Sequence, residues 1–277
     1  MLPIAAVLPP LPRFKVVDVG ASLGLLPPDY ADLAKAVPCD IVGFEPVAIE
    51  CEKLKALKRP GHVYLPYTIG DGAVHTFYEC NSPYNSSLFE PNLALTEKFQ
   101  NLSDFMRVTR THAVETRRLD SIVETEGMDF LKVDVQGAEL LVFEGAVERL
   151  KNVLVIHTEV EFVPMYKNQP LFADVDSFLR AHGFAFHKLT PWGRTFKPII
   201  MKHDPGAALS QSLWGDAVYV RDFMTFEGML PVALLKLATI LHENEKSYDL
   251  VAATLAAYDR QMNTAMQENY LRQMLGG

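Results

Sequence analysis

The sequence is poor in cysteine, has no excess of positive charge and contains no long apolar run. Its three cysteines, Cys39, Cys51 and Cys80, lack metal-type spacing, and an odd number does not suggest a disulfide framework. We therefore expect reduced thiols and a cytoplasmic protein. The formal charge of −8 argues against nonspecific binding to nucleic acid. No apolar segment approaches the length of a membrane span, so we expect no such span.

The chain does contain alternating strand-like and helix-like segments. This alternation predicts an α/β fold with a doubly wound parallel sheet, and 277 residues give ample length for a large core. The sheet strands are expected at Phe14–Val19, Asp40–Glu45, Val63–Ile69, Asp129–Val135 and Val153–Glu159, with an antiparallel closing pair at Phe184–Leu189 and Ala217–Val220. We also expect a hairpin turn at Gly70-Asp71-Gly72, an exposed strand at Val108–Leu119 whose arginines face solvent, and one helix over Ala138–Leu150.

The strand pattern stops after Asp222. Leu230, Leu234, Leu237 and Leu241 have the spacing of one amphipathic helix, and a second such pattern starts near Val251. We therefore divide the chain into a catalytic domain, residues 1–222, and a helical extension, residues 223–277. The helical hairpin is expected to pack on the catalytic domain or on a partner, including a second copy of the chain.

A glycine-punctuated turn follows the first strand, in the order Asp18, Gly20, Ser22 and Gly24, and an acid, Glu45, ends the second strand. A dinucleotide loop requires G-x-G-x-x-G, because the pyrophosphate approaches the backbone closely. Here the middle glycine is missing and an acid precedes the turn. These features favour S-adenosylmethionine, a ligand with an ammonium and a sulfonium, and Glu45 is expected to accept its ribose hydroxyls.

The remaining cofactor contacts are expected at the ends of neighbouring elements. Pro46 begins the helix after Glu45. Ile69, Gly70 and Asp71 end the third strand, where the adenine edge is expected. Ser87, in the loop Ser86-Ser87-Leu88, either bonds the cofactor or holds the loop in shape. Asp134, at the end of the fourth strand, completes the predicted cofactor set.

Polar residues also gather at the ends of strands four and five. Lys132 and Asp134 share one face of strand four, and His157, Glu159 and Glu161 share one face of strand five. We expect Asp134, Glu159 or His157 to act as a base on a substrate hydroxyl, with Lys132 holding the carboxylates in place. As a secondary hypothesis, Asp134, Glu159 and Glu161 hold Mg²⁺ or Mn²⁺.

These segments together resemble the FkbM family of S-adenosylmethionine-dependent methyltransferases. The resemblance covers about residues 14 to 190. It is carried by Val17-Asp18-Val19-Gly20-Ala21-Ser22-Leu23-Gly24, Gly43-Phe44-Glu45-Pro46, Ser86-Ser87-Leu88, Leu119-Asp120-Ser121-Ile122, Leu131-Lys132-Val133-Asp134-Val135-Gln136-Gly137-Ala138-Glu139, Thr158-Glu159-Val160-Glu161 and Met165-Tyr166. It implies a seven-stranded Rossmann-like (class I) methyltransferase sheet and O-methylation of a sugar or other small-molecule hydroxyl. The family often has Glu where this chain has Gln136, which weakens a catalytic role for that side chain.

Two other classes of function remain as alternatives. A nicotinamide-dependent oxidoreductase uses a related sheet, but the missing middle glycine and Asp18 count against it. A noncatalytic adapter on the same fold would bind its partner through the helical extension. An adapter of this kind would have lost its active-site residues. The intact glycine turn, together with Glu45, Lys132 and Asp134, argues against such a loss.

Overall fold

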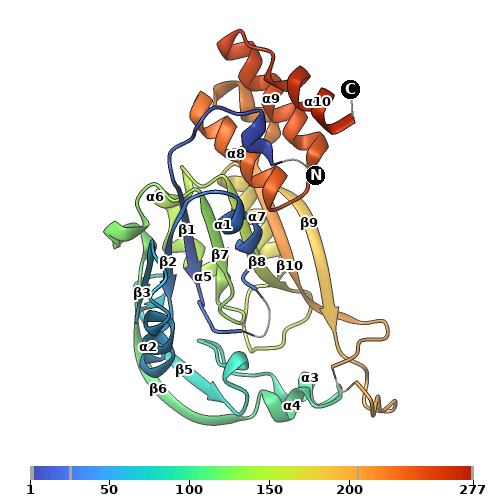
Figure 1. Ribbon diagram of the computed structural model, residues 1–277. Coiled ribbons are helices and arrows are strands. Elements are labelled where there is room, and N and C mark those ends of the chain that lie inside the picture. The colour runs from blue at the N-terminus through green and yellow to red at the C-terminus, as the bar shows by residue number, and fades with distance from the viewer. Residues whose placement is uncertain (1–2, 25–26, 205, 276–277) are drawn as a thin grey trace.

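The computed structural model describes residues 3–24, 27–204 and 206–275. A seven-stranded sheet forms its centre (Figure 1). The strand order is β3 (His62–Leu65), β2 (Cys39–Phe44), β1 (Phe14–Val19), β7 (Phe130–Val133), β8 (Val155–Glu161), β10 (Ser212–Arg221) and β9 (Phe184–Gly193). The first five are parallel, and β10 runs antiparallel to β8 and β9. The predicted doubly wound sheet with its antiparallel closing pair is confirmed.

A second, three-stranded sheet was not expected. Its order is β4 (Thr68–Ile69), β6 (Val108–Arg117) and β5 (Val74–Cys80). The predicted strand Val63–Ile69 is thus two strands in two sheets, and Pro66, which has no backbone N–H to donate, lies between them. The predicted hairpin at Gly70-Asp71-Gly72 is wrong in its pairing, because β4 and β5 both pair with β6 and not with each other.

Helices cover both faces of the central sheet. The chain before the carboxy-terminal extension contains α1 (Ala31–Ala36), α2 (Ala48–Ala56), α3 (Leu93–Thr96), α4 (Leu102–Phe105), α5 (Glu139–Glu144), α6 (Val147–Leu150) and α7 (Phe172–Ala181). The single helix predicted over Ala138–Leu150 is divided into α5 and α6. A Cβ at Gly145 would lie 2.0 Å from the carbonyl oxygen of Gly70, so the chain turns there and lets the β4–β5 connection approach.

Two apolar cores lie on opposite faces of the sheet. Phe14, Val16 and Phe130 face α1 and the carboxy-terminal helices. Val17 and Leu131 face α5, α6 and α7. The alternation of side chains along each strand therefore divides the sheet residues between the two cores.

Three helices follow the last strand: α8 (Pro231–Glu243), α9 (Tyr248–Met262) and α10 (Met266–Leu275). The predicted helical hairpin is confirmed by α8 and α9, while α10 was not expected. Figure 1 shows these helices beside the amino-terminal η1 (Ile4–Ala6), at the end of the molecule opposite β5 and β6. Leu237 and Leu255 belong to the same core as Phe14 and Val16. No helix in the described ranges is long and apolar enough to cross a membrane.

We predict that the extension and the sheet unfold together, because they share this core. Leu237 is fully buried and Leu230 is 71% exposed. Leu237→Ala should lower the free energy of unfolding by about 2–5 kcal/mol. Leu230→Ala, the same chemical change at the surface, should cost about 0.5 kcal/mol or less. Urea unfolding followed by circular dichroism measures both, and two separate transitions in the wild-type protein would contradict a shared core.

Candidate active site

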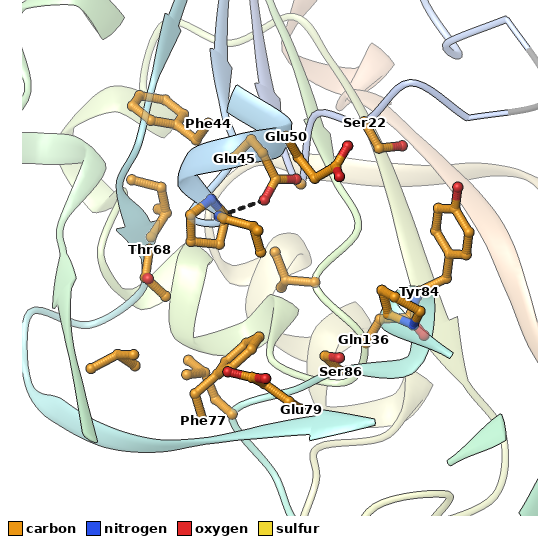
Figure 2. Close-up of a pocket in the computed structure, with 18 of the residues that line it drawn as sticks. Ser22, Phe44, Glu45, Glu50, Thr68, Phe77, Glu79, Tyr84, Ser86 and Gln136 are labelled. Carbon is orange, nitrogen blue, oxygen red and sulfur yellow. Dashed lines mark hydrogen bonds between the residues drawn. The ribbon is translucent and has the colours of Figure 1, made fainter. Parts of the chain in front are cut away.

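A cavity of about 950 Å³ lies between the carboxyl ends of β1, β2 and β7 and the inner face of the second sheet. Gly20, Ser22 and Glu45 line it from the central sheet, and Phe77 and His112 line it from β5 and β6. Figure 2 shows Glu45 and Glu50 on one side and Phe77, Glu79 and Ser86 on the other. The volume is within the range of small-molecule and cofactor pockets.

The predicted cofactor residues divide into two groups. Those that line the cavity are Gly20, Ser22, Glu45, Pro46, Ile69 and Asp134. Those that do not are Asp18, Gly24, Gly70, Asp71 and Ser87. The residues at the ends of β1, β2, β4 and β7 therefore come together as expected. Several of their sequence neighbours have structural contacts instead.

The backbone conformation at position 20 requires a glycine. Its φ is +81°, and a Cβ there would lie 2.0 Å from the carbonyl oxygen of Asp134. The turns after β1 and β7 are thus in direct contact, which no larger residue permits. This contact brings the glycine turn and Asp134 to the same end of the cavity.

Asp18 is buried, and its side chain bonds to protein groups. Only 4% of its surface is exposed, and its Oδ1 lies 3.4 Å from the Lys132 Nζ. The Tyr30 hydroxyl donates a 2.9 Å hydrogen bond to its Oδ2. The expectation that this acid faces the ligand at the turn is therefore not met. Asp18 neutralises a buried lysine, as the cost of burying an unpaired charge requires.

Lys132 is the centre of this arrangement. Its Nζ donates to the Gly20 carbonyl at 3.1 Å and lies 3.5 Å from the Asp134 Oδ2. Burial alone would lower the pKa of this ammonium, but Asp18 and Asp134 raise the pKa above its usual value. Lys132 therefore stays charged and holds the ends of β1 and β7 together. The predicted positioning of a carboxylate by Lys132 agrees with this geometry.

Acids dominate the cavity wall near Glu45. The Glu45 Oε1 accepts a 2.7 Å hydrogen bond from the Val47 N–H, as Figure 2 shows. Burial raises the pKa of Glu45 above its usual value. Glu50, Glu79 and Asp134 also line the cavity, against the cations Lys53 and Arg110. These acids, and not Asp18, favour a positively charged ligand.

Two of the remaining residues, Asp71 and Ser87, support the surrounding loops. Asp71 accepts hydrogen bonds from the Ala73 N–H at 2.9 Å and the Thr116 hydroxyl at 3.2 Å. Ser87, 1% exposed, donates to the carbonyl of Gln136 at 2.6 Å. Of the two roles considered for Ser87, the geometry favours holding the loop in shape.

Gln136 bridges two acids at the end of the sheet. Its Nε2 donates to the Asp134 Oδ1 at 2.8 Å and to the Glu159 Oε2 at 2.7 Å. Its φ of +59° is in the left-handed region, which is uncommon outside glycine. Asp134 and Glu159 are therefore brought together, as expected, but through an amide donor. A carboxylate at position 136 would replace that donor by a third acceptor.

His157 is separated from the other predicted catalytic residues. It is 2.8 Å from the Glu245 Oε1 through its Nε2 and packs against Phe130. Burial lowers the pKa of His157, but Glu245 outweighs it and raises the pKa overall. His157 does not line the cavity. Its contacts connect β8 to the segment between α8 and α9, so it is placed to dock the carboxy-terminal helices.

Two of the three acids predicted to hold a metal, Glu159 and Glu161, lie together, but Asp134 is not in their cluster. Ligand oxygens of Glu139, Glu159 and Glu161 lie within 4.8 Å of one another, so Glu139 takes the place expected for Asp134. Burial raises the pKa of Glu139 to about 7 and the pKa values of Glu159 and Glu161 well above their usual range. Glu139 was not part of the predicted metal set.

The second sheet supplies lining residues that the sequence did not reveal. Arg110 and His112 line the cavity, and the His112 Nδ1 lies 3.2 Å from the Glu79 Oε1. Arg110 is exposed, as expected for the arginines of this strand, and it also borders the cavity. The period-two alternation of Arg110, His112 and Val114 was a usable signal, because all three line the cavity.

The chain matches one family model and several solved structures. The family model described as "Methyltransferase FkbM domain" matches residues 18–186, more than half of the chain. Among solved structures, the chain is similar to a methyltransferase FkbM from Methylobacillus flagellatus KT, with 15% identity and a TM-score of 0.40. That match covers 79% of this chain and 48% of the other, so the chain spans about half the length of that protein.

Two further solved structures are similar at lower identity. Magnesium protoporphyrin IX methyltransferase from Synechocystis PCC 6803, with bound SAM, has 10% identity and a TM-score of 0.36, covering 76% of this chain and 71% of that one. An S-adenosylmethionine-dependent methyltransferase from Mesorhizobium loti has 9% identity and a TM-score of 0.37, covering 79% and 95%. No curated protein matches the sequence.

We predict that Lys132 is a major contributor to stability through its buried ion pair. Lys132→Met leaves Asp18 buried without its cation and should lower the free energy of unfolding by about 3–5 kcal/mol. The double variant Asp18→Asn with Lys132→Met should regain much of this loss. Lys151→Met, which breaks the exposed pair with Glu148, should cost about 1 kcal/mol or less. Equal losses for the single and double variants, measured by urea unfolding, would contradict the pairing.

Proposed function

The chain belongs to the FkbM methyltransferase family, and we propose that it transfers a methyl group from S-adenosylmethionine to a hydroxyl of a sugar or other small biosynthetic molecule. The observation that carries this proposal is the meeting of Glu45, Gly20 and Asp134 at one cavity. One acid follows β2 and the other follows β7. Because β2 and β7 are separated in the sheet, the two acids mark two ends of the cavity, one for a nucleoside and the other for a reacting group.

The residues present fit S-adenosylmethionine. Glu45 keeps one carboxylate oxygen on the Val47 N–H and has a second for ribose hydroxyls. Ile69, Phe44 and Tyr67 give an apolar wall suited to an adenine ring. Glu50 suits the positive charge of the amino group. When bound, this cofactor supplies an electrophilic methyl group.

Asp134 is the proposed base. A sugar hydroxyl is a poor nucleophile at neutral pH, so a group must accept its proton as the new bond forms. Asp134 is held by Lys132 on one oxygen and by Gln136 on the other. This fixed carboxylate faces the cavity and accepts the acceptor proton. Glu159 lies behind Gln136 and acts on Asp134 through that amide, while His157 has no part in the proton transfer.

The alternative classes have less support. A dinucleotide loop leads directly into a helix amino end, whereas α1 begins only at Ala31, well after Gly20. An adapter has no need of a fixed acid beside a cofactor-sized cavity. We further propose a cytoplasmic setting, which the free and buried thiols of Cys39, Cys51 and Cys80 support. Self-association through α8–α10 stays a prediction.

The reaction class is tested with S-adenosylmethionine labelled in its methyl group. The purified protein is incubated with a panel of sugars and hydroxylated natural products, and the products are analysed by mass spectrometry. The proposal expects a methyl ether. Transfer only to amines or carboxylates, or no detectable binding of S-adenosylmethionine by calorimetry, would refute it.

We predict that Glu45→Ala weakens S-adenosylmethionine binding about 10- to 100-fold. The reason is the loss of charge-assisted hydrogen bonds to ribose, each worth about 1.5–3 kcal/mol. Isothermal titration calorimetry measures the change. Glu52→Ala is the matched control, because Glu52 is on α2, the helix that follows Glu45, and its side chain is 70% exposed. Similar dissociation constants for the Glu45 variant and wild type would place the ribose elsewhere.

We predict that Asp134→Asn lowers the methyl-transfer rate by about 10²- to 10⁴-fold, the usual contribution of a positioned base. The affinity for S-adenosylmethionine should change less than about threefold, because the amide keeps the shape of the side chain. Single-turnover rates and calorimetry separate the two effects. A comparable loss of rate and of cofactor affinity would instead assign Asp134 to cofactor binding.

A further inference from the structure

Glu139, Glu159 and Glu161 form a carboxylate cluster beneath the Asp134–Gln136 turn. Glu139 is 2% exposed and Glu161 is 1% exposed, while Glu159 is partly exposed toward Gln136. One ligand oxygen from each lies within 4.8 Å of the others. Among the described residues, no lysine, arginine or histidine forms an ion pair with any of the three. A buried charge without such a partner is costly unless a metal ion or a proton neutralises it.

The hydrogen bonds of these acids leave oxygens available. Glu139 accepts from the Val135 and Gly137 N–H groups, both on Oε1. Glu159 accepts from Gln136 on Oε2. The Glu161 Oε1 is fully buried and has no hydrogen-bond partner. This unpartnered oxygen is an observation separate from the clustering, and it belongs to the side chain with the least exposure of the three.

We propose that Glu139, Glu159 and Glu161 bind one hard divalent cation, of the class Mg²⁺, Mn²⁺ or Ca²⁺, behind the catalytic turn. Oxygen-only ligand sets favour these ions over zinc or copper. Oxygens on opposite sides of Ca²⁺ are about 4.6–5.2 Å apart, and those around Mg²⁺ at most about 4.2 Å. Three oxygens 4.8 Å apart lie about 2.8 Å from a common centre, so each would move inward by up to about 0.5 Å to reach Ca²⁺ and by under about 1 Å to reach Mg²⁺.

The cation acts on the turn, not on the substrate. Glu139 holds the backbone of Val135 and Gly137, and Glu159 holds the side chain of Gln136. Fixing both carboxylates fixes the segment that carries Asp134 to the cavity. The ion enters past Glu159, the partly exposed member of the cluster. This inference goes beyond the proposed methyl transfer and does not depend on it.

The test uses the full chain, treated with a chelator and dialysed. Mn²⁺ is titrated at neutral pH, and free Mn²⁺ is followed by electron paramagnetic resonance. We expect about one Mn²⁺ per chain, and competition by Mg²⁺ and Ca²⁺ ranks the three ions. Each ion that binds should also raise the thermal unfolding midpoint, because it binds the folded state alone.

Glu161→Gln should weaken Mn²⁺ binding at least about tenfold and remove the thermal increment. Glu148→Gln, an exposed acid on α6, is the matched control and should bind as wild type does. If Glu161→Gln does not fold, Glu159→Gln replaces it, since that position is partly exposed. Unchanged binding in these cluster variants overturns the site.

Absence of Mn²⁺ binding at millimolar concentration would also overturn it and would mean that the acids share protons. In that case the wild-type unfolding midpoint does not respond to any of the three ions. Calorimetry with S-adenosylmethionine on the same samples keeps this failure separate from a failure of the proposed function. Retained cofactor binding without cation binding refutes only the cation site.

Discussion

The active end of this protein depends on one buried cation, Lys132. Its ammonium contacts Asp18, the Gly20 carbonyl and Asp134, which belong to the ends of two neighbouring strands. The register pairs Asp18 with Lys132 across β1 and β7, so the ion pair follows directly from strand pairing. Because the Gly20 backbone also lies against Asp134, the glycine turn and the proposed base have a fixed relation. Displacing either strand end would leave charges buried without partners.

The same constraint explains why polar residues are tolerated at this end of the sheet. Asp134 has Lys132 on one oxygen and the Gln136 amide on the other. Gln136 adopts a left-handed backbone, and the Ser87 hydroxyl donates a hydrogen bond to its carbonyl. Such strained and fully bonded positions cluster at functional sites, where the surrounding structure maintains them. Gln136 therefore supports the site by donating hydrogen bonds to Asp134 and Glu159. A glutamate at this position has no N–H to donate, so another group would have to neutralise the three carboxylates.

Much of the sheet was predictable, because buried parallel strands are apolar runs ending in turn residues. Phe14–Val19 has the bounds expected from the sequence, and Glu45 follows a strand and lines the cavity as predicted. The second sheet was not predictable in this way, since Pro66 divides a run that reads as one strand. Asp18 bonds to Tyr30, which is outside any periodic pattern, and His157 bonds to Glu245, which is distant in sequence. Local propensity contains no information about such tertiary pairs.

The carboxy-terminal helices are also joined to the central sheet by buried polar contacts. His157 is paired in register with Lys132 on β7, and it bonds to Glu245 between α8 and α9. Asn244, the preceding residue, donates to the carbonyl of Asp29 and accepts from the Leu33 N–H in the segment that carries Tyr30. Tyr30 in turn bonds Asp18. The extension is therefore linked by hydrogen bonds to both ends of the row that runs from Asp18 through Lys132 to His157.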